Sequence, residues 1–215
     1  IDIQRIEKLY FHENSHVRQI ALQVVGVLGK EEHSSKVASL LKSETEPEIL
    51  QTVLQTLRNL KAEGSMPLIQ TLLTHQVIRL QAECVIYLYE RGDPKGKELA
   101  LDHFNSWLES QSSEHLRAAS YLIGEIGTSY FLSEISSLLK NSDVEVKKEA
   151  IEAAGKSPHP ALMPLLLHYL QDRHLSRSAR KALQHYNPEM MLPQLVETFQ
   201  LASNSTHCQN EIIRL

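Results

Sequence analysis

The stretch Val17-Arg18-Gln19-Ile20-Ala21-Leu22-Gln23-Val24-Val25-Gly26-Val27-Leu28-Gly29 decides the fold class. Its apolar residues recur at the three- and four-residue spacing of one helix face. Small residues stand at Ala21 and Gly26, where a neighbouring helix must come close. The pattern therefore predicts an amphipathic helix that packs tightly against other helices.

The same pattern returns five more times along the chain. The copies lie at Ile49–Leu60, Ile78–Tyr89, His115–Gly127, Val146–Gly155 and Leu175–Tyr186. Their central positions, counted from Ala21, follow one another at intervals of 32, 29, 37, 31 and 29 residues. A period of about 30 residues is what two short helices and two turns require, so the sequence predicts an array of two-helix repeats.

A second apolar helix follows each copy. We expect these second helices at Ser35–Lys42, Met66–Thr74, Lys97–Ser110, Leu132–Lys140, Leu162–Gln171 and Met190–Gln200. Strand signals are nearly absent, so the predicted class is all-α. The expected repeats are 12–43, 44–75, 76–111, 112–141, 142–172 and 173–201, with partial repeats at 1–11 and 202–215. They are expected to form one repeat domain, with Phe104 and Trp107 in the core of the long third repeat.

The repeated unit resembles the HEAT-like repeat of bacterial HEAT proteins and of phycobilisome-lyase-type proteins. The resemblance rests on Val17-Arg18 followed by Ala21, Gly26 and Gly29, and on Val146-Lys147 followed by Ala150 and Gly155. The copies at Ile49 and His115 depart from it, because each has a leucine where the basic residue belongs. The resemblance implies a right-handed α-solenoid of about six repeats. It implies no particular partner, because such repeats serve many.

Composition narrows the function classes. Lys and Arg number 22 against 26 Asp and Glu, a net charge of −4, so nothing draws the whole chain toward nucleic acid or anionic lipid. Its apolar runs are too short to insert in a membrane. Cys84 and Cys208, the two cysteines, form neither a disulfide framework nor a zinc pair, which favours a cytoplasmic location. Neither end of the sequence has the pattern of a natural terminus, so we expect a fragment of a larger protein.

The sequence offers no catalytic or metal-binding motif. The 11 histidines include no His-Glu-x-x-His, and the only His-Glu pair, at His12-Glu13, is expected in a turn. HEAT-like di-iron hydroxylases use such a pair in each of four repeats, which this chain does not have. We therefore predict no metal, no cofactor and no enzymatic activity.

One basic patch suggests an anion. Arg173, Arg177, Arg180 and Lys181 follow each other closely, and the three arginines share one face of the sixth first helix. We expect the first helices on the convex side, away from the groove with which some HEAT-like solenoids bind DNA. A solvated face is the simplest interpretation, an acidic or phosphate-bearing partner is the alternative, and nucleic acid is not expected.

The second helices are expected to line the concave side. The residue before each terminal apolar pair should point into the groove, which gives Ser39, Thr71, Ser106, Ser137, His168 and Glu197, with Leu167 beside them. This mostly neutral, polar row suits a peptide or protein segment better than a polyanion. We expect replacement of Leu167 and His168 together to weaken partner binding without unfolding the protein.

These observations lead to one main hypothesis and two alternatives. The main hypothesis is a non-catalytic scaffold that binds a polypeptide on its concave face, near repeats three to six. The first alternative is a regulatory domain tethered to a larger protein such as a membrane transporter or signalling enzyme. The second is a lyase-type chaperone for a prosthetic group, although no cluster of cysteines or aromatic residues supports it.

Overall fold

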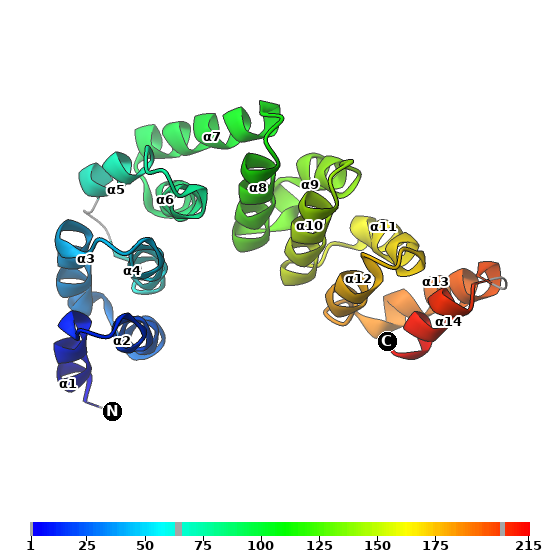
Figure 1. Ribbon diagram of the computed structural model, residues 1–215, viewed down its shortest axis with the longest axis horizontal. Helices are drawn as coiled ribbons and strands as arrows, with labels where there is room; N and C mark the ends of the chain where they lie inside the picture. Colours follow the sequence, from blue (N-terminus) through cyan, green and yellow to red (C-terminus); the bar gives the residue numbers. More distant parts are fainter. Residues whose placement is uncertain (1, 63–65, 203–204) are drawn as a thin grey trace. The chain divides into compact units, whose positions relative to one another are not determined.

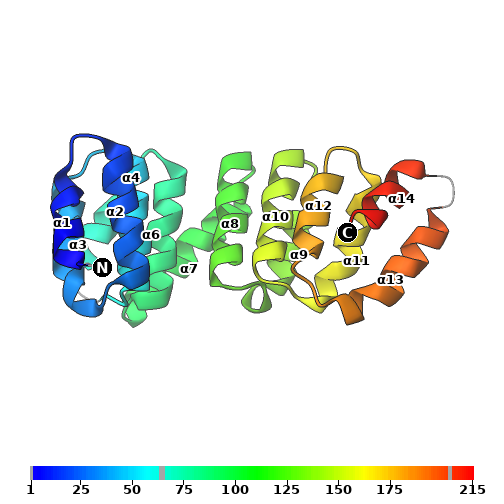
Figure 2. The same ribbon diagram turned by 90° about the horizontal axis from the view of Figure 1, so that it is seen from below.

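The structure is a computed structural model that describes residues 2–62, 66–202 and 205–215 (Figures 1 and 2). The chain divides into two compact units, Ile1–Ser106 and Trp107–Leu215, and the division falls inside one long helix, α7. Each unit has its own internal packing.

Unit 1 is a double layer of helices. Its elements are α1 (Ile3–Glu7), a 3₁₀ turn (Lys8–Phe11), α2 (Ser15–Leu28), a 3₁₀ turn (Glu31–His33), α3 (Ser34–Ser43), α4 (Pro47–Asn59), α5 (Met66–Leu72), α6 (Ile78–Arg91) and most of α7 (Pro94–Glu109). Helices α2, α4 and α6 pack one against the next and form the first-helix layer. The second-helix layer contains α3 and α5, which pack on α4 and α6 respectively.

Unit 2 repeats this arrangement. After the end of α7 come α8 (Ser113–Ile126), a 3₁₀ turn (Thr128–Tyr130), α9 (Leu132–Leu139), α10 (Val144–Lys156), a 3₁₀ turn (Pro160–Leu162), α11 (Met163–His168), a 3₁₀ turn (Tyr169–Gln171), α12 (Ser176–Leu183), α13 (Pro188–Leu201) and α14 (Thr206–Ile213). Figures 1 and 2 show α8, α10 and α12 side by side as the first-helix layer of this unit. Helices α9, α11 and α13 form its second-helix layer.

The predicted all-α fold of helical repeats is confirmed. The described residues contain 14 α-helices and no strand, and each predicted first and second helix has a counterpart at the expected place. Phe104 and Trp107 are buried, as predicted. No helix in the described ranges is both long enough and apolar enough to cross a membrane. The repeat bounds stay a prediction, and positions 203 and 204 of the partial repeat 202–215 lie outside the described residues.

Glycines set the distance between successive first helices in unit 2. A Cβ atom placed on Gly124 of α8 would lie 2.8 Å from the Cα of Ala153 on α10. A Cβ atom on Gly155 of α10 would lie 2.8 Å from the Cα of Ala182 on α12. The backbones thus approach as closely as glycine allows, and each helix covers the apolar face of the next.

Ion pairs and tyrosines tie neighbouring repeats together. In unit 1, Arg18 Nε lies 2.9 Å from Glu44 Oε2, and its NH2 group lies 2.8 Å from Glu46 Oε1. The buried carboxylate of Glu83 pairs with Arg58 of the preceding repeat at 3.4 Å. In unit 2, the Tyr186 hydroxyl donates to the Ala154 carbonyl at 3.2 Å. These contacts are directional, so they fix the register between stacked helices. Apolar burial alone is not directional and would not define that register.

We expect Gly124→Ala to destabilise unit 2 by about 1–3 kcal/mol, because the added methyl group forces two backbones apart. The matched control is Gly26→Ala on α2, where the nearest atom to the new Cβ is the flexible Asn59 Nδ2, at 3.3 Å. That control should be neutral or stabilising by up to about 1 kcal/mol, because alanine favours the helix. Urea unfolding of both variants measures the difference, and equal effects would contradict the close-approach argument.

Acid should weaken unit 1 through Glu44. Burial raises the pKa of this carboxyl, but hydrogen bonds from the Glu46 and Thr45 amides and from Arg18 outweigh it, so the net pKa lies below the ordinary 4.5. A lowered folded-state pKa contributes stability above the unfolded-state value, and this contribution is lost as the pH falls through the folded-state value. The free energy of unfolding in urea should therefore fall less between about pH 5 and pH 3 for Glu44→Gln than for wild type.

The control for this pH series is Glu13→Gln, which neutralises an exposed carboxylate that makes no ion pair within the described residues. It should leave the acid-induced loss of stability unchanged. If Glu44→Gln and wild type lose stability in parallel on acidification, Glu44 does not carry the effect.

Candidate functional site

The structure exposes all but one of the seven predicted partner-binding residues. The exposed ones are Ser39, Thr71, Ser106, Ser137, His168 and Glu197. Leu167 was expected to point outward beside His168, and this expectation is wrong, because its side chain is only 3% exposed. Leu167 lies on α11 among the apolar residues of the core. The reason is the short helix, whose run of three leucines turns two, Leu166 and Leu167, inward.

The exposed residues do not gather at one place. His168 and Glu197, with the edge of Leu167, line a hollow of about 370 Å³ between α11 and α13. Ser39 lines a separate hollow in unit 1 with Tyr10 and Phe11. Ser137 lines the larger hollow described next. Thr71 and Ser106 stand exposed on α5 and α7.

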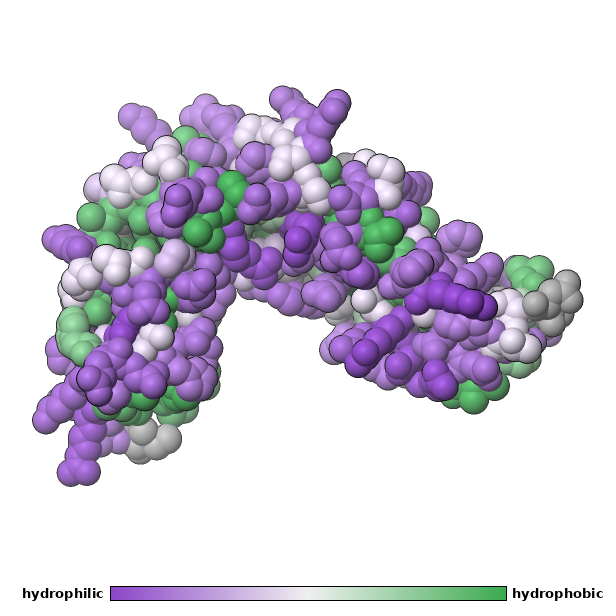
Figure 3. Space-filling model, in the orientation of Figure 1, coloured by the Kyte–Doolittle hydropathy of each residue, from purple (hydrophilic) through white to green (hydrophobic). Residues whose placement is uncertain are grey.

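Apolar surface concentrates on one second helix. The face drawn in Figure 3 is mainly hydrophilic, with separate hydrophobic patches. Helix α13 alone carries five exposed large hydrophobic residues: Met190, Leu192, Val196, Phe199 and Leu201.

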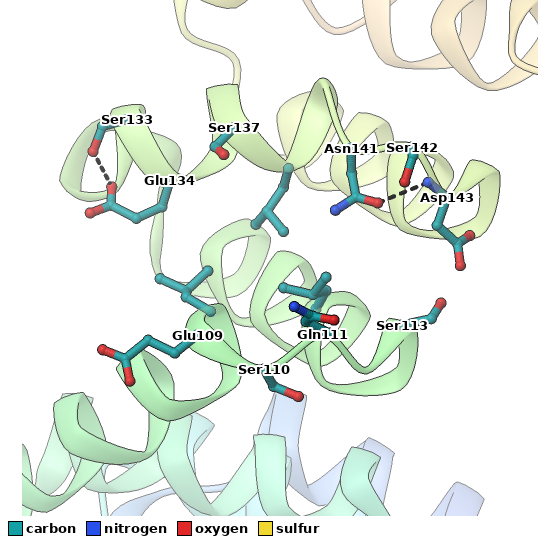
Figure 4. A pocket seen from close by; sticks show the side chains of 13 residues that line it. Glu109, Ser110, Gln111, Ser113, Ser133, Glu134, Ser137, Asn141, Ser142 and Asp143 are labelled. Atoms are coloured by element: carbon teal, nitrogen blue, oxygen red, sulfur yellow. Dashed lines mark hydrogen bonds between the residues drawn. The ribbon is translucent and has the colours of Figure 1, made fainter.

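A hollow in unit 2 has a volume of about 750 Å³ and is lined by five serines, so we call it the serine hollow (Figure 4). Its lining is Leu108, Glu109, Ser110, Gln111, Ser113, Leu116, Ser133, Glu134, Ser137, Leu138, Asn141, Ser142 and Asp143. One side comes from the end of α7 and the start of α8. The other comes from α9 and the turn into α10, and the two sides face each other across the opening.

Helix caps position the polar groups of the serine hollow. Asp143 is the N-cap of α10, where its Oδ1 accepts from the Glu145 amide at 2.7 Å. The Asn141 side chain accepts from the Asp143 amide at 2.8 Å and fixes the turn. Glu134 accepts from the Ser133 hydroxyl at 2.7 Å. The hollow thus has a preformed shape, because its polar walls are held by the helix ends.

The serine hollow is electrostatically negative. Its three charged residues, Glu109, Glu134 and Asp143, are all acidic, and none of the lining residues is basic. The pKa of Asp143 lies below its usual value, first because of the Ser113 hydroxyl, then because of backbone amides and the Arg117 charge. Asp143 therefore stays ionised at neutral pH. Glu109 has no hydrogen-bond partner among the described residues, so its carboxylate is available to a ligand.

The serine hollow presents hydrogen-bonding and negatively charged groups. The lining offers hydroxyls, amides and carboxylates, and one of these hydroxyls, Ser110 Oγ, hydrogen-bonds His115 Nδ1 at 3.1 Å. Across residues 2–62, 66–202 and 205–215, no group of three His, Cys, Asp or Glu side chains could hold a metal ion. The hollow can accept hydrogen bonds and neutralise positive charge.

The four residues of the predicted basic patch do not share one surface in the structure. Arg180, expected on the same face as Arg173 and Arg177, instead pairs with the buried Glu211, with Nε 3.0 Å from Oε2. Its place in a patch open to solvent is therefore a wrong prediction. Arg177 and Lys181 line a groove of about 260 Å³ between α10 and α12. Arg173 is exposed and lies outside that groove.

Sequence reasoning missed most of the serine hollow. The turns that contain Ser113 and Asn141-Ser142-Asp143 are two walls of this cavity, which the sequence analysis did not predict. The available signal was their matching position: each turn precedes a first helix, in consecutive repeats. Turns at equivalent places in neighbouring repeats lie side by side, so their exposed side chains share one surface.

The match to a family model agrees with the repeat pattern. Residues 101–185 match the family model of HEAT repeats. A solved structure, the crystal structure of an engineered protein, is 18% identical and covers 100% of this chain and 94% of that one, with a TM-score of 0.31. No curated protein matches the chain. The serine hollow lies wholly within the segment that matches HEAT repeats.

We expect Leu167→Ala to destabilise unit 2 by about 2–5 kcal/mol, because it leaves a cavity in the core. The neighbouring change His168→Ala removes an exposed side chain and should alter stability by less than about 0.5 kcal/mol. Thermal and urea unfolding of the two variants separate a core role from a surface role. A Leu167→Ala variant as stable as His168→Ala would restore the original assignment of Leu167 to the surface.

Proposed function

We propose that this chain, whose residues 101–185 match the family model of HEAT repeats, is a non-catalytic scaffold that binds a polypeptide segment in the serine hollow of unit 2. HEAT repeats generally mediate protein–protein interaction. The observation that carries the proposal is a large preformed polar hollow, to which three consecutive predicted repeats within the matched segment contribute.

The size and polarity of the hollow favour a polypeptide. A volume of about 750 Å³ falls within the range of specific ligand sites, which is roughly 300–1,000 Å³. Small-molecule sites of this size are mostly apolar, whereas this one is lined mainly by hydroxyl, amide and carboxylate groups. An extended peptide presents backbone N–H and C=O groups along its length, and such groups pair with serine hydroxyls and side-chain amides.

Charge selects the kind of segment. Three carboxylates and no basic side chain among the lining residues favour a segment with lysine or arginine. Glu109 offers an unpaired carboxylate, whereas Glu134 and Asp143 already accept hydrogen bonds and retain further acceptor capacity. We therefore propose a partner segment that is basic and hydrophilic, held by charge-assisted hydrogen bonds and a matched shape.

A labelled Lys/Ser peptide and its Glu/Ser counterpart of equal length provide the test by fluorescence anisotropy. The chain should bind the Lys/Ser peptide and not the Glu/Ser peptide. Ser137→Trp fills the hollow with a large side chain that blocks the peptide and should weaken binding by at least about tenfold, a free-energy loss of about 1.4 kcal/mol.

The matched control is Ser35→Trp, which makes the same change at an exposed serine on α3, another second helix, away from the serine hollow. It should bind the Lys/Ser peptide as tightly as wild type does. Equal affinity of Ser137→Trp and Ser35→Trp, or equal binding of the Lys/Ser and Glu/Ser peptides, would contradict this function.

A further inference from the structure

The groove between α10 and α12 lies in the first-helix layer of unit 2 and is separate from the serine hollow. It is lined by Glu152, Gly155, Lys156, Arg177, Ser178, Lys181, Ala182 and His185. Small residues form the floor of the groove. Because Gly155 has no Cβ atom, the backbone of α10 comes into contact with Ala182 of α12. The longer side chains on either side therefore stand as walls above a narrow channel.

Basic side chains dominate these walls. Lys156 comes from α10, and Arg177 and Lys181 come from α12, where their separation of four residues places them on one face. His185 follows in the turn after α12. Glu152 is the single acidic residue in the lining. Counting histidine as neutral, the lining carries three positive charges and one negative charge, a net charge of +2.

The basic residues of the chain differ in whether a carboxylate of a neighbouring repeat pairs with them. Arg18, Arg58, Arg117 and Arg180 each pair with a carboxylate of a neighbouring repeat. Lys156 likewise pairs with Glu125 at 2.6 Å. In contrast, Arg177, Lys181 and His185 have no side-chain partner within the described part of the chain. Like charges four residues apart on a helix repel each other, so an anion in the groove would relieve an unfavourable interaction.

We propose that this groove binds the phosphate group of a phosphorylated side chain on a partner polypeptide. A phosphomonoester carries a charge between −1.5 and −2, roughly, at neutral pH and has three strong acceptor oxygens. The planar guanidinium of Arg177 can donate two parallel hydrogen bonds to it, and Lys181 supplies a point charge from the next turn of the same helix. The groove volume of about 260 Å³ admits one such group with part of its side chain.

A single phosphate on a polypeptide fits better than a nucleic acid or a membrane. The chain has a net charge of −4, and Glu152 and Glu125 stand beside the groove, so the positive potential is local. A polyanion needs a run of basic contacts to follow its backbone. Arg180, which could have extended the run, is occupied by Glu211.

The test compares a labelled phosphoserine peptide with its unphosphorylated twin by fluorescence anisotropy. The phosphopeptide should bind more tightly than the twin. Arg177→Ala combined with Lys181→Ala should weaken phosphopeptide binding by about ten- to a hundredfold, the range expected when charged hydrogen bonds are lost. Both side chains are exposed, so circular dichroism and thermal unfolding should match wild type.

The matched control is Arg173→Ala combined with Lys140→Ala, which removes the same charge from exposed positions outside the groove. It should bind the phosphopeptide as wild type does. An equal loss in control and groove variants, equal binding of the two peptides, or tighter binding to phosphatidylserine vesicles or duplex DNA would overturn the proposal. Ser137→Trp should not change phosphopeptide affinity, so failure at the serine hollow and failure at this groove are distinguishable.

Discussion

The close approach of successive first helices is the constraint on which the rest of unit 2 depends. Gly124 meets Ala153 and Gly155 meets Ala182 at distances that exclude any larger side chain. Each helix then covers apolar surface that its neighbour cannot bury alone, as in other repeat proteins. The same contacts place the turns before α8 and α10 next to each other and bring the side chains of α10 and α12 to one groove. Both proposed surfaces thus follow from the stacking.

The fold could be predicted from the sequence because the information is local and repeated. The apolar spacing around Ala21, with small residues where helices cross, recurs often enough to fix the period and the helix pairs. Even Phe104 and Trp107 were assigned correctly to the core. The division into two units within α7 was not predicted, because no composition change marks residues 106–107.

The surface could be predicted only in part, for a physical reason. Exposure depends on which way each helix faces, and a short helix such as α11 has too few turns for the sequence to fix its rotation. One residue of error turned Leu167 from the core to the surface in the prediction. Ion-pair partners are still harder to predict from the sequence. The partner of Arg180, for example, is Glu211, which lies 31 residues away in sequence. The serine hollow and the α10–α12 groove arise between repeats, so no single helix encodes either.

Amide hydrogen exchange in the presence and absence of the Lys/Ser peptide tests the central claim, that unit 2 binds a polypeptide in the serine hollow. The account predicts slower exchange in residues 108–116 and 133–143, the two sides of that hollow, with little change in α2, α4 and α6 of unit 1. Protection confined to unit 1 or to α13 and α14, with none around Ser137, would contradict it.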